Sequence, residues 1–230
     1  MKTNQDYKNA ALAVLKGNWP KAIIATIVYL AIAVAISLLS NLEQIFDLSK
    51  TLAIVIMSVS FVLTILITNP LGVGYANAFR LLYVDGDTEL TSNLFRIPFS
   101  NYLHVLWGYL LVGIKTFLWT LLFIIPGIIK TFAYAMTPFI LVEEPELSAK
   151  EAIAKSVKMM DGHKFDLFYL YLSFIGWFLL SILTLGIGLL WLTPYTETAV
   201  VSFYLSLKEE QAENAAPAPV SEPVPGKAEE

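Results

Sequence analysis

Two charged side chains, Lys115 and Glu197, lie inside long apolar stretches of the sequence. Lys115 precedes Pro126 within one such stretch, and Glu197 follows the Gly186-Ile-Gly188 turn in another. At about 1.5 Å per helical residue, both would lie near the middle of a bilayer whose apolar core is about 30 Å thick. A charge at that depth costs at least about 2.5 kcal/mol unless it is paired or hydrated.

This cost leads us to expect that the two charges lie together. We predict that Lys115 and Glu197 pair across a helical bundle or line a wet cavity. The cavity would include the polar side chains around Glu197, which are Thr193, Tyr195, Thr196 and Thr198. Two structural alternatives remain open: a buried ion pair that fixes helix register, or a lysine whose ammonium reaches the membrane surface.

Signals for enzymatic chemistry are weak. The chain has no cysteine, and its two histidines, His104 and His163, are far apart in sequence. It contains no HExxH, GxSxG or phosphate-binding glycine motif. A metal site would have to combine His163 with Asp161 and Asp166 beside Lys164, and the positive charge makes that set poor. We therefore predict no catalytic residues, no metal and no cofactor, and the scattered basic residues predict no nucleic-acid partner.

The composition is that of a membrane protein. Hydrophobic residues make up 57% of the 230 residues and charged ones 15%, whereas an ordinary soluble domain has about a quarter charged. A soluble chain of this length would need more polar surface to cover its core. The segment 209–230 differs, because it is rich in Glu, Pro and Ala. We predict that it is a disordered acidic tail following a membrane domain over 1–208.

A helix needs about 20 apolar residues to cross a bilayer. The sequence therefore predicts an all-α fold, a polytopic membrane helical bundle of about six transmembrane helices, at 21–40, 51–69, 103–125, 128–142, 165–184 and 189–207. The fourth segment is short and contains Pro138, so it either crosses or forms a re-entrant or kinked segment. We expect the second span to continue as helix past Asn69-Pro70 toward Tyr83, with a bend at the proline.

The basic residues are distributed unevenly between the loops. With these spans, twelve Lys and Arg residues fall on one side, and the opposite loops hold two, Lys50 and Lys130. Because cytoplasmic loops carry the excess of positive charge, both termini are predicted to be cytoplasmic.

Two short amphipathic segments, 146–162 and 6–16, are predicted to be cytoplasmic helices at the membrane surface. Ser148 and Glu151 have the spacing of a capping box, and Gly162 and Gly17 would end the two helices. They are either ordinary connecting helices or interfacial helices that contact anionic lipid headgroups. The candidate headgroup contacts are Lys8, Lys16, Lys150 and Lys158.

Several short strings between residues 119 and 204 form a recognisable set. They include Pro126-Gly-Ile-Ile-Lys130, Tyr134-Ala-Met-Thr-Pro138, Ser148-Ala-Lys-Glu-Ala152, Gly162-His-Lys164, Leu185-Gly-Ile-Gly-Leu-Leu-Trp191 and Pro194-Tyr195. Leu15-Lys-Gly-Asn-Trp19 and Pro70-Leu-Gly72 extend the set toward the N-terminus. Together they resemble the bacterial membrane family catalogued as domain of unknown function 975, over nearly everything before the tail. The resemblance implies a multi-span bacterial membrane fold, and it brings no established activity and no catalytic residues.

These observations favour a non-enzymatic protein of the bacterial inner membrane that binds membrane lipids or another membrane protein. The alternative is a small transporter or permease with Lys115 and Glu197 in its pathway. A membrane-embedded enzyme ranks third, because the apolar spans hold few carboxylates.

Overall fold

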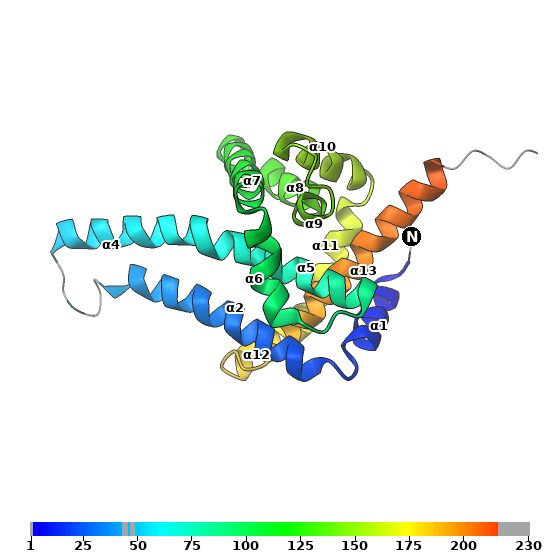
Figure 1. Ribbon diagram of the computed structural model, residues 1–230, viewed down its shortest axis with the longest axis horizontal. Helices are drawn as coiled ribbons and strands as arrows, with labels where there is room; N and C mark the ends of the chain where they lie inside the picture. Colours follow the sequence, from blue (N-terminus) through cyan, green and yellow to red (C-terminus); the bar gives the residue numbers. More distant parts are fainter. Residues whose placement is uncertain (1, 43–45, 47–48, 216–230) are drawn as a thin grey trace, which may run out of the picture.

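The computed structural model describes residues 2–42, 46 and 49–215. Over these residues the regular elements are helices and none is a strand, which confirms the all-α prediction. Figure 1 shows a body from which a two-helix arm extends, with the N-terminus and the end of the last helix on the far side from the arm.

The arm consists of α2 (Trp19–Ser40) and α4 (Lys50–Leu63), which run antiparallel to each other. Pro20 suits the first turn of α2, where a backbone N–H has no helical partner. In the most apolar window of the stretch Lys50–Asp85, 11% of the residues are buried. Apolar surface left uncovered to this extent calls for a lipid environment.

The helix that leaves the arm passes Pro70 without a break. α4 continues through a π-helical turn, η1 (Thr64–Thr68), into α5 (Asn69–Asp85), as the sequence predicted. Pro70 has no backbone N–H, so the Leu66 carbonyl lacks its usual helical donor. The Tyr102 hydroxyl donates to that carbonyl at 2.8 Å. A side chain from the body therefore supplies the hydrogen bond that the proline removes.

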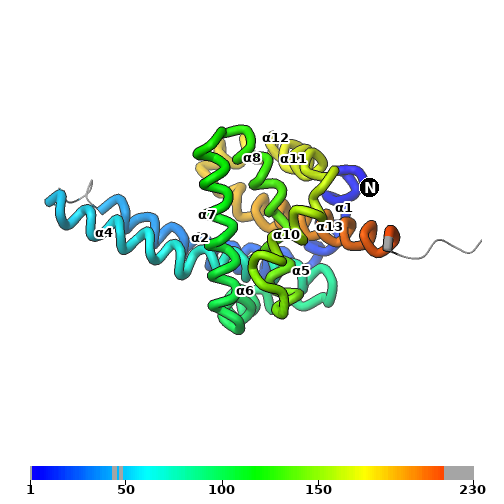
Figure 2. Tube along the Cα trace, turned by 90° about the horizontal axis from the view of Figure 1, so that it is seen from above, coloured from blue at the N-terminus to red at the C-terminus, as the bar shows by residue number. Residues whose placement is uncertain are grey.

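The body contains α5 and further helices around it. These are α1 (Asn4–Leu15), α6 (Leu90–Ser100), α7 (Tyr102–Leu122), α8 (Ile124–Ala133), α9 (Thr137–Glu143), α10 (Ala149–Met159), α11 (Lys164–Leu172), α12 (Ile175–Leu183) and α13 (Leu189–Ala215). α5 and α13 supply much of the core, where Phe79, Phe203 and Tyr204 are almost fully buried. α7 runs steeply across the direction of the arm, as a comparison of Figures 1 and 2 shows.

Five helical stretches are long and apolar enough to cross a membrane. They are Trp19–Ser40, Lys50–Asp85, Tyr102–Leu122, Ile124–Glu143 and Lys164–Leu183, and they correspond to the first five predicted spans. The sixth predicted span, 189–207, is helical within α13 but is not among the five. Many α13 side chains between Thr198 and Leu207 are buried by protein, so this helix does not need an apolar surface all round. That α13 crosses the membrane stays a prediction.

α13 also extends into the segment predicted as a tail. It continues to Ala215, so residues 209–215 are helical and the tail cannot begin at 209. Glu, Gln and Ala favour helix there, and Glu209 pairs with Lys2 at 3.3 Å. Residues 216–230 of the predicted tail lie outside the described residues.

Both segments predicted as surface helices are helical, and their place at a membrane surface stays a prediction. In α10 the Ser148 Oγ accepts the Glu151 N–H at 3.3 Å, and the Glu151 carboxylate accepts the Ser148 N–H at 2.8 Å. α1 carries the same reciprocal pair between Thr3 and Asp6. The helices are thus held by local hydrogen bonds at their N-termini.

Candidate functional site

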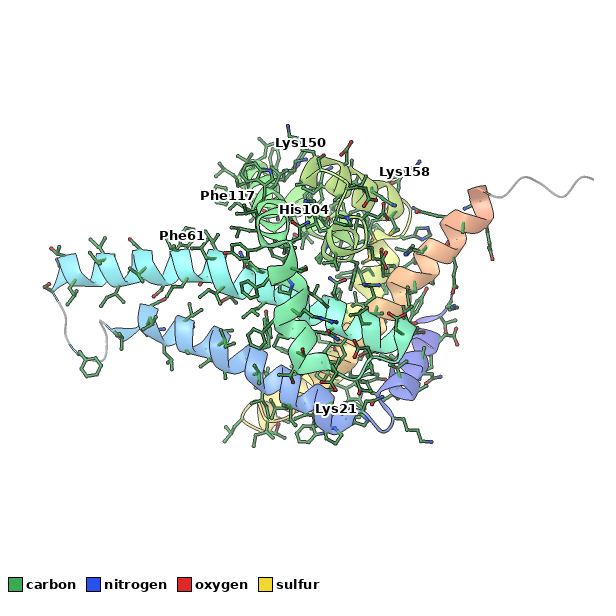
Figure 3. The ribbon with its side chains drawn as sticks, viewed as in Figure 1. Lys21, Phe61, His104, Phe117, Lys150 and Lys158 are labelled. Carbon is green, nitrogen blue, oxygen red and sulfur yellow. The ribbon has the colours of Figure 1, made fainter. Side chains whose placement is uncertain are left out.

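A large cavity lies between the helices of the body. Its volume is about 1170 Å³, and its lining comes from α2, α5, α7, α8, α9, α11, α12 and α13. Most of the lining is aromatic or aliphatic, including Phe117 of α7, which is labelled in Figure 3. The polar part of the lining consists of hydroxyl groups of Thr and Tyr, together with one carboxylate.

That carboxylate belongs to Glu197, in the middle of α13. Glu197 is the one charged residue among the described residues that line the cavity. Its carboxylate makes no hydrogen bond or ion pair with any part of the chain that the structure describes. Thr193 and Thr196, on the same helix, line the cavity beside it. The predicted wet cavity around Glu197 thus has a counterpart in the structure.

Lys115 is not part of this cavity. Its neighbours Thr116 and Phe117 line the space, but Lys115 does not, and across the described ranges no ion pair joins it to Glu197. The structure therefore does not bring together the two charges that the sequence analysis paired. Equal depth in a membrane does not decide which way two side chains point around their helix axes.

Two of the other residues expected in the cavity also lie elsewhere. The Tyr195 ring packs edge-on against Phe174, with 5.0 Å between ring centroids. The buried Thr198 hydroxyl donates to the Pro194 carbonyl at 2.7 Å, four residues earlier in the same helix. This is the usual bond from a helical threonine hydroxyl to the carbonyl four residues earlier.

The cavity adjoins two interruptions in apolar helices. The fourth predicted span is broken between α8 and α9, where Tyr134 and Ala135 line the cavity, and whether this segment crosses the membrane stays a prediction. The fifth predicted span is broken between α11 and α12, where Phe174 lines it. Irregular backbone at membrane depth is tolerated where it lines a cavity or is buried in protein.

The two surface helices satisfy carbonyl groups at these interruptions. Ser156 of α10 is buried, and its hydroxyl donates to the Ala133 carbonyl at 2.9 Å. Lys8 of α1 donates to the Ser173 carbonyl at 2.7 Å and lies 4.4 Å from the centre of the Phe174 ring. Burial lowers the pKa of the Lys8 ammonium. α1 and α10 therefore do more than connect spans, because each caps the end of a broken helix.

The four lysines predicted to contact lipid headgroups differ in their surroundings. Lys8 is partly buried and engaged with Ser173, whereas Lys16, Lys150 and Lys158 are exposed. Figure 3 shows Lys150 and Lys158, both on α10, at the outer edge of the body. Three of the four are thus free to reach an external anion.

A second carboxylate, Glu143 at the end of α9, lies in a dense hydrogen-bonded network. It accepts from Arg80 of α5 at 2.9 Å, and from Tyr204 and Lys208 of α13 at 2.6 and 2.7 Å. Arg80 also donates to the Asn77 side chain at 3.0 Å. This network, which we call the Glu143 network, joins three helices of the body.

The sequence analysis did not foresee the Glu143 network. Arg80 and Lys208 are among the twelve basic residues on the predicted cytoplasmic side, and Glu143 directly follows the fourth predicted span. Their common place on the predicted cytoplasmic side was the one sequence signal for this network, because residues at the ends of spans on the same side of a membrane can meet there. Four tyrosines of the cavity lining were missed as well, because they come from four separate helices. They are Tyr29, Tyr75, Tyr109 and Tyr171.

The histidines give no sign of a metal site. The His163 ring nitrogens lie 3.1 Å from Asp166 and 3.4 Å from Glu210. Over the described residues, no cluster of three or more His, Cys, Asp and Glu side chains has the arrangement to hold a metal ion. His163 is accounted for by its two carboxylate neighbours.

Comparison with known proteins gives one match. No curated protein and no solved structure matches the chain. A family model, described as "Protein of unknown function (DUF975)", matches residues 121–211. The strings Leu15–Trp19 and Pro70–Gly72 lie outside the matched part, so their resemblance stays a prediction. The matched residues run from the end of α7 into α13 and include both helix interruptions and Glu197, so this part of the chain is similar to the DUF975 family.

Proposed function

We propose that this chain is a non-enzymatic membrane protein that binds a lipophilic molecule in the cavity beside Glu197. The cavity carries the proposal: it holds about 1170 Å³ between helices, and its walls are mainly apolar with a few hydroxyl groups and one carboxylate. Small-molecule sites are commonly apolar pockets of about 300–1,000 Å³ in which a few polar groups fix the orientation of the ligand.

We also propose a multi-pass arrangement in the bacterial inner membrane with both termini in the cytoplasm. The excess of basic residues on one side supports this orientation. The packing of α1 against α13, which holds Lys2 next to Glu209, supports placing the two termini on the same side. A single cysteine placed at Glu213 should be protected from a membrane-impermeant thiol reagent in intact spheroplasts, and one placed at Ile187 should be labelled. The absence of natural cysteines makes this assay direct.

A transporter or permease is the second candidate function. It is favoured by the position of Glu197 in a cavity that adjoins two broken helices, because some transporters build their substrate sites from interrupted helices near mid-membrane. Lys115 has no role in this proposed transport pathway, because it does not line the cavity. Uptake of a bound ligand into reconstituted vesicles would separate transport from binding alone.

Contact with anionic lipid headgroups remains a further proposal for Lys16, Lys150 and Lys158, and it is supported by their exposure. Lys8 is a weaker candidate, since its ammonium already binds the Ser173 carbonyl. Another membrane protein as partner stays a prediction from the sequence.

The binding proposal is tested by filling the cavity. Gly113 of α7 lines the cavity, and a side chain added there meets no atom within 4 Å. Gly113→Leu should therefore occupy the space without disturbing the helix. Gly176→Leu in α12 is the matched control, because that position is equally open and does not line the cavity.

The probe is a neutral long-chain alcohol bearing a photoreactive diazirine, added to the full-length protein in membranes. We expect crosslinks on the α13 peptide that contains Thr193 and Thr196 in the unmodified protein and in Gly176→Leu. Gly113→Leu should lose them and keep the crosslinks on the lipid-exposed arm. Equal labelling of the α13 peptide in all three proteins would overturn the proposal.

A further inference from the structure

We infer that the ligand of the Glu197 cavity is a lipophilic cation, an apolar molecule that carries a positive charge and no phosphate. This inference rests on the proposed binding function and adds the charge of the ligand to it. It follows from one carboxylate that has no partner among the described residues, from the aromatic rings of the same cavity, and from a described lining that contains no Lys or Arg.

The first step concerns the carboxylate. A charged side chain at membrane depth is costly and is normally paired or faces a polar pathway. Glu197 has no hydrogen-bonding or ionic partner among the described residues, and it faces a space large enough for a ligand. Elsewhere in the chain carboxylates near apolar segments are paired, as Glu143 and Glu144 are. The missing partner of Glu197 is therefore a cation that enters the cavity.

The second step concerns the rings. Four tyrosines line the same cavity as Glu197, namely Tyr29, Tyr75, Tyr109 and Tyr171. The rings of Tyr29 and Tyr75 are stacked with centroids 5.0 Å apart, and the Tyr75 hydroxyl is bonded to Thr26 at 2.7 Å. Fixed aromatic rings attract organic cations through the negative charge of their faces.

The third step excludes other ligand classes. No Lys or Arg is among the described residues that line the cavity, so an anionic headgroup would meet Glu197 without a counter-charge. A phosphate next to the carboxylate would be repelled. Calcium and magnesium ions require several oxygen ligands, and across the described residues no cluster of acidic side chains supplies them. An organic cation needs one carboxylate and an aromatic wall.

The experiment uses tetraphenylphosphonium as the cation and triphenylphosphine oxide as a neutral compound with similar rings. Binding of each is measured by isothermal titration calorimetry on the full-length protein in detergent. Glu197→Gln removes the charge and keeps the shape of the side chain, and Gly113→Leu fills the cavity. Glu209→Gln and Gly176→Leu are the respective controls, because Glu209 lies at an exposed pair and Gly176 lies outside the cavity. The melting temperature of each variant shows that it is folded.

We expect the unmodified protein and both controls to bind the cation at least about tenfold more tightly than the neutral compound. Glu197→Gln should abolish this preference, and Gly113→Leu should weaken both compounds. If the neutral compound binds as tightly as the cation and Glu197→Gln changes neither, the inference fails and the proposed function stands. If neither compound binds and the alcohol probe does not label the cavity, both fail. Cation binding that Gly113→Leu leaves intact would place the site elsewhere and overturn the inference.

Discussion

Glu143 and Glu197 are two glutamates in apolar surroundings with opposite environments. Glu143 is bonded to Arg80, Tyr204 and Lys208, and its side chain is 12% exposed. Glu197 has no such partner among the described residues and faces a cavity of about 1170 Å³. Both belong to the helical body: Glu197 is part of α13, and Glu143 is bonded to side chains of α13.

The difference is between a carboxylate that holds helices together and a carboxylate that is free to bind a ligand. A carboxylate whose oxygens are fully used by neighbouring side chains holds helices together and has nothing left to offer a ligand. A carboxylate that faces open space is a cost to the folded state, and such costs persist where a site is used.

The largest effect is expected from Glu143→Gln. The change leaves the Arg80 guanidinium, also 12% exposed, without its anion, and breaking such a pair typically costs about 3 kcal/mol. The free energy of unfolding in detergent, measured by denaturant titration, should fall by this amount. Glu209→Gln is the control, because its pair with Lys2 is more than half exposed and is worth less than about 1 kcal/mol. Equal losses in the two variants would refute a structural role for the Glu143 network.

A smaller effect is expected from Gly74→Ala, on the helix that carries Arg80. A methyl group at Gly74 would lie 2.2 Å from the Leu94 carbonyl oxygen of α6, so backbone atoms must move. The free energy of unfolding should fall by about 2 kcal/mol. Gly113→Ala faces open space and should instead leave stability unchanged or raise it by up to about 1 kcal/mol, because alanine favours helix. A similar loss at Gly113 would mean that the cavity wall is packed.

Glu197→Met should change stability in the direction opposite to Glu143→Gln. Methionine has a similar length and fits apolar walls, so the uncompensated polar group is removed. The free energy of unfolding should rise by about 1 kcal/mol in the same titration. A fall as large as that of Glu143→Gln would show that Glu197 has a structural partner, and the comparison between the two glutamates would collapse.

Local features of this fold could be predicted from sequence. The capping box of Ser148 and Glu151 involves residues three positions apart, and the continuous helix through Pro70 follows from a single apolar run. The five long apolar helices that match the first five predicted spans were also predictable, because crossing lipid would require a fixed length of apolar helix. Each of these follows from neighbours in the chain.

The contacts between helices could not be predicted in the same way. Arg80 and Glu143 are 63 residues apart, and Lys208 is a further 65 from Glu143, so topology decides whether they meet. The expected pair of Lys115 and Glu197 shows the same limit. Membrane depth was estimated from the number of residues along each helix, whereas pairing also depends on rotation about the helix axis. The cavity lies beside Glu197 but not beside Lys115 for this reason.

The smallest effect concerns a third carboxylate, Glu151 at the exposed start of α10. Hydrogen bonds from Ser148 lower the pKa of this carboxyl below its ordinary value of 4.5. Because the folded pKa is the lower one, the stabilisation is complete above pH 4.5 and is lost as the pH falls through the folded pKa. Amide hydrogen exchange in α10 should therefore lose protection on acidification in this range. Glu151→Gln cannot ionise, so the loss should be smaller in that variant, and the difference between the two proteins isolates Glu151 from other acids. On acidification, the substitution Glu151→Gln should change amide protection around the Glu143 network less than it changes protection in α10. Identical pH profiles in both proteins would show that ionisation of Glu151 does not stabilise α10.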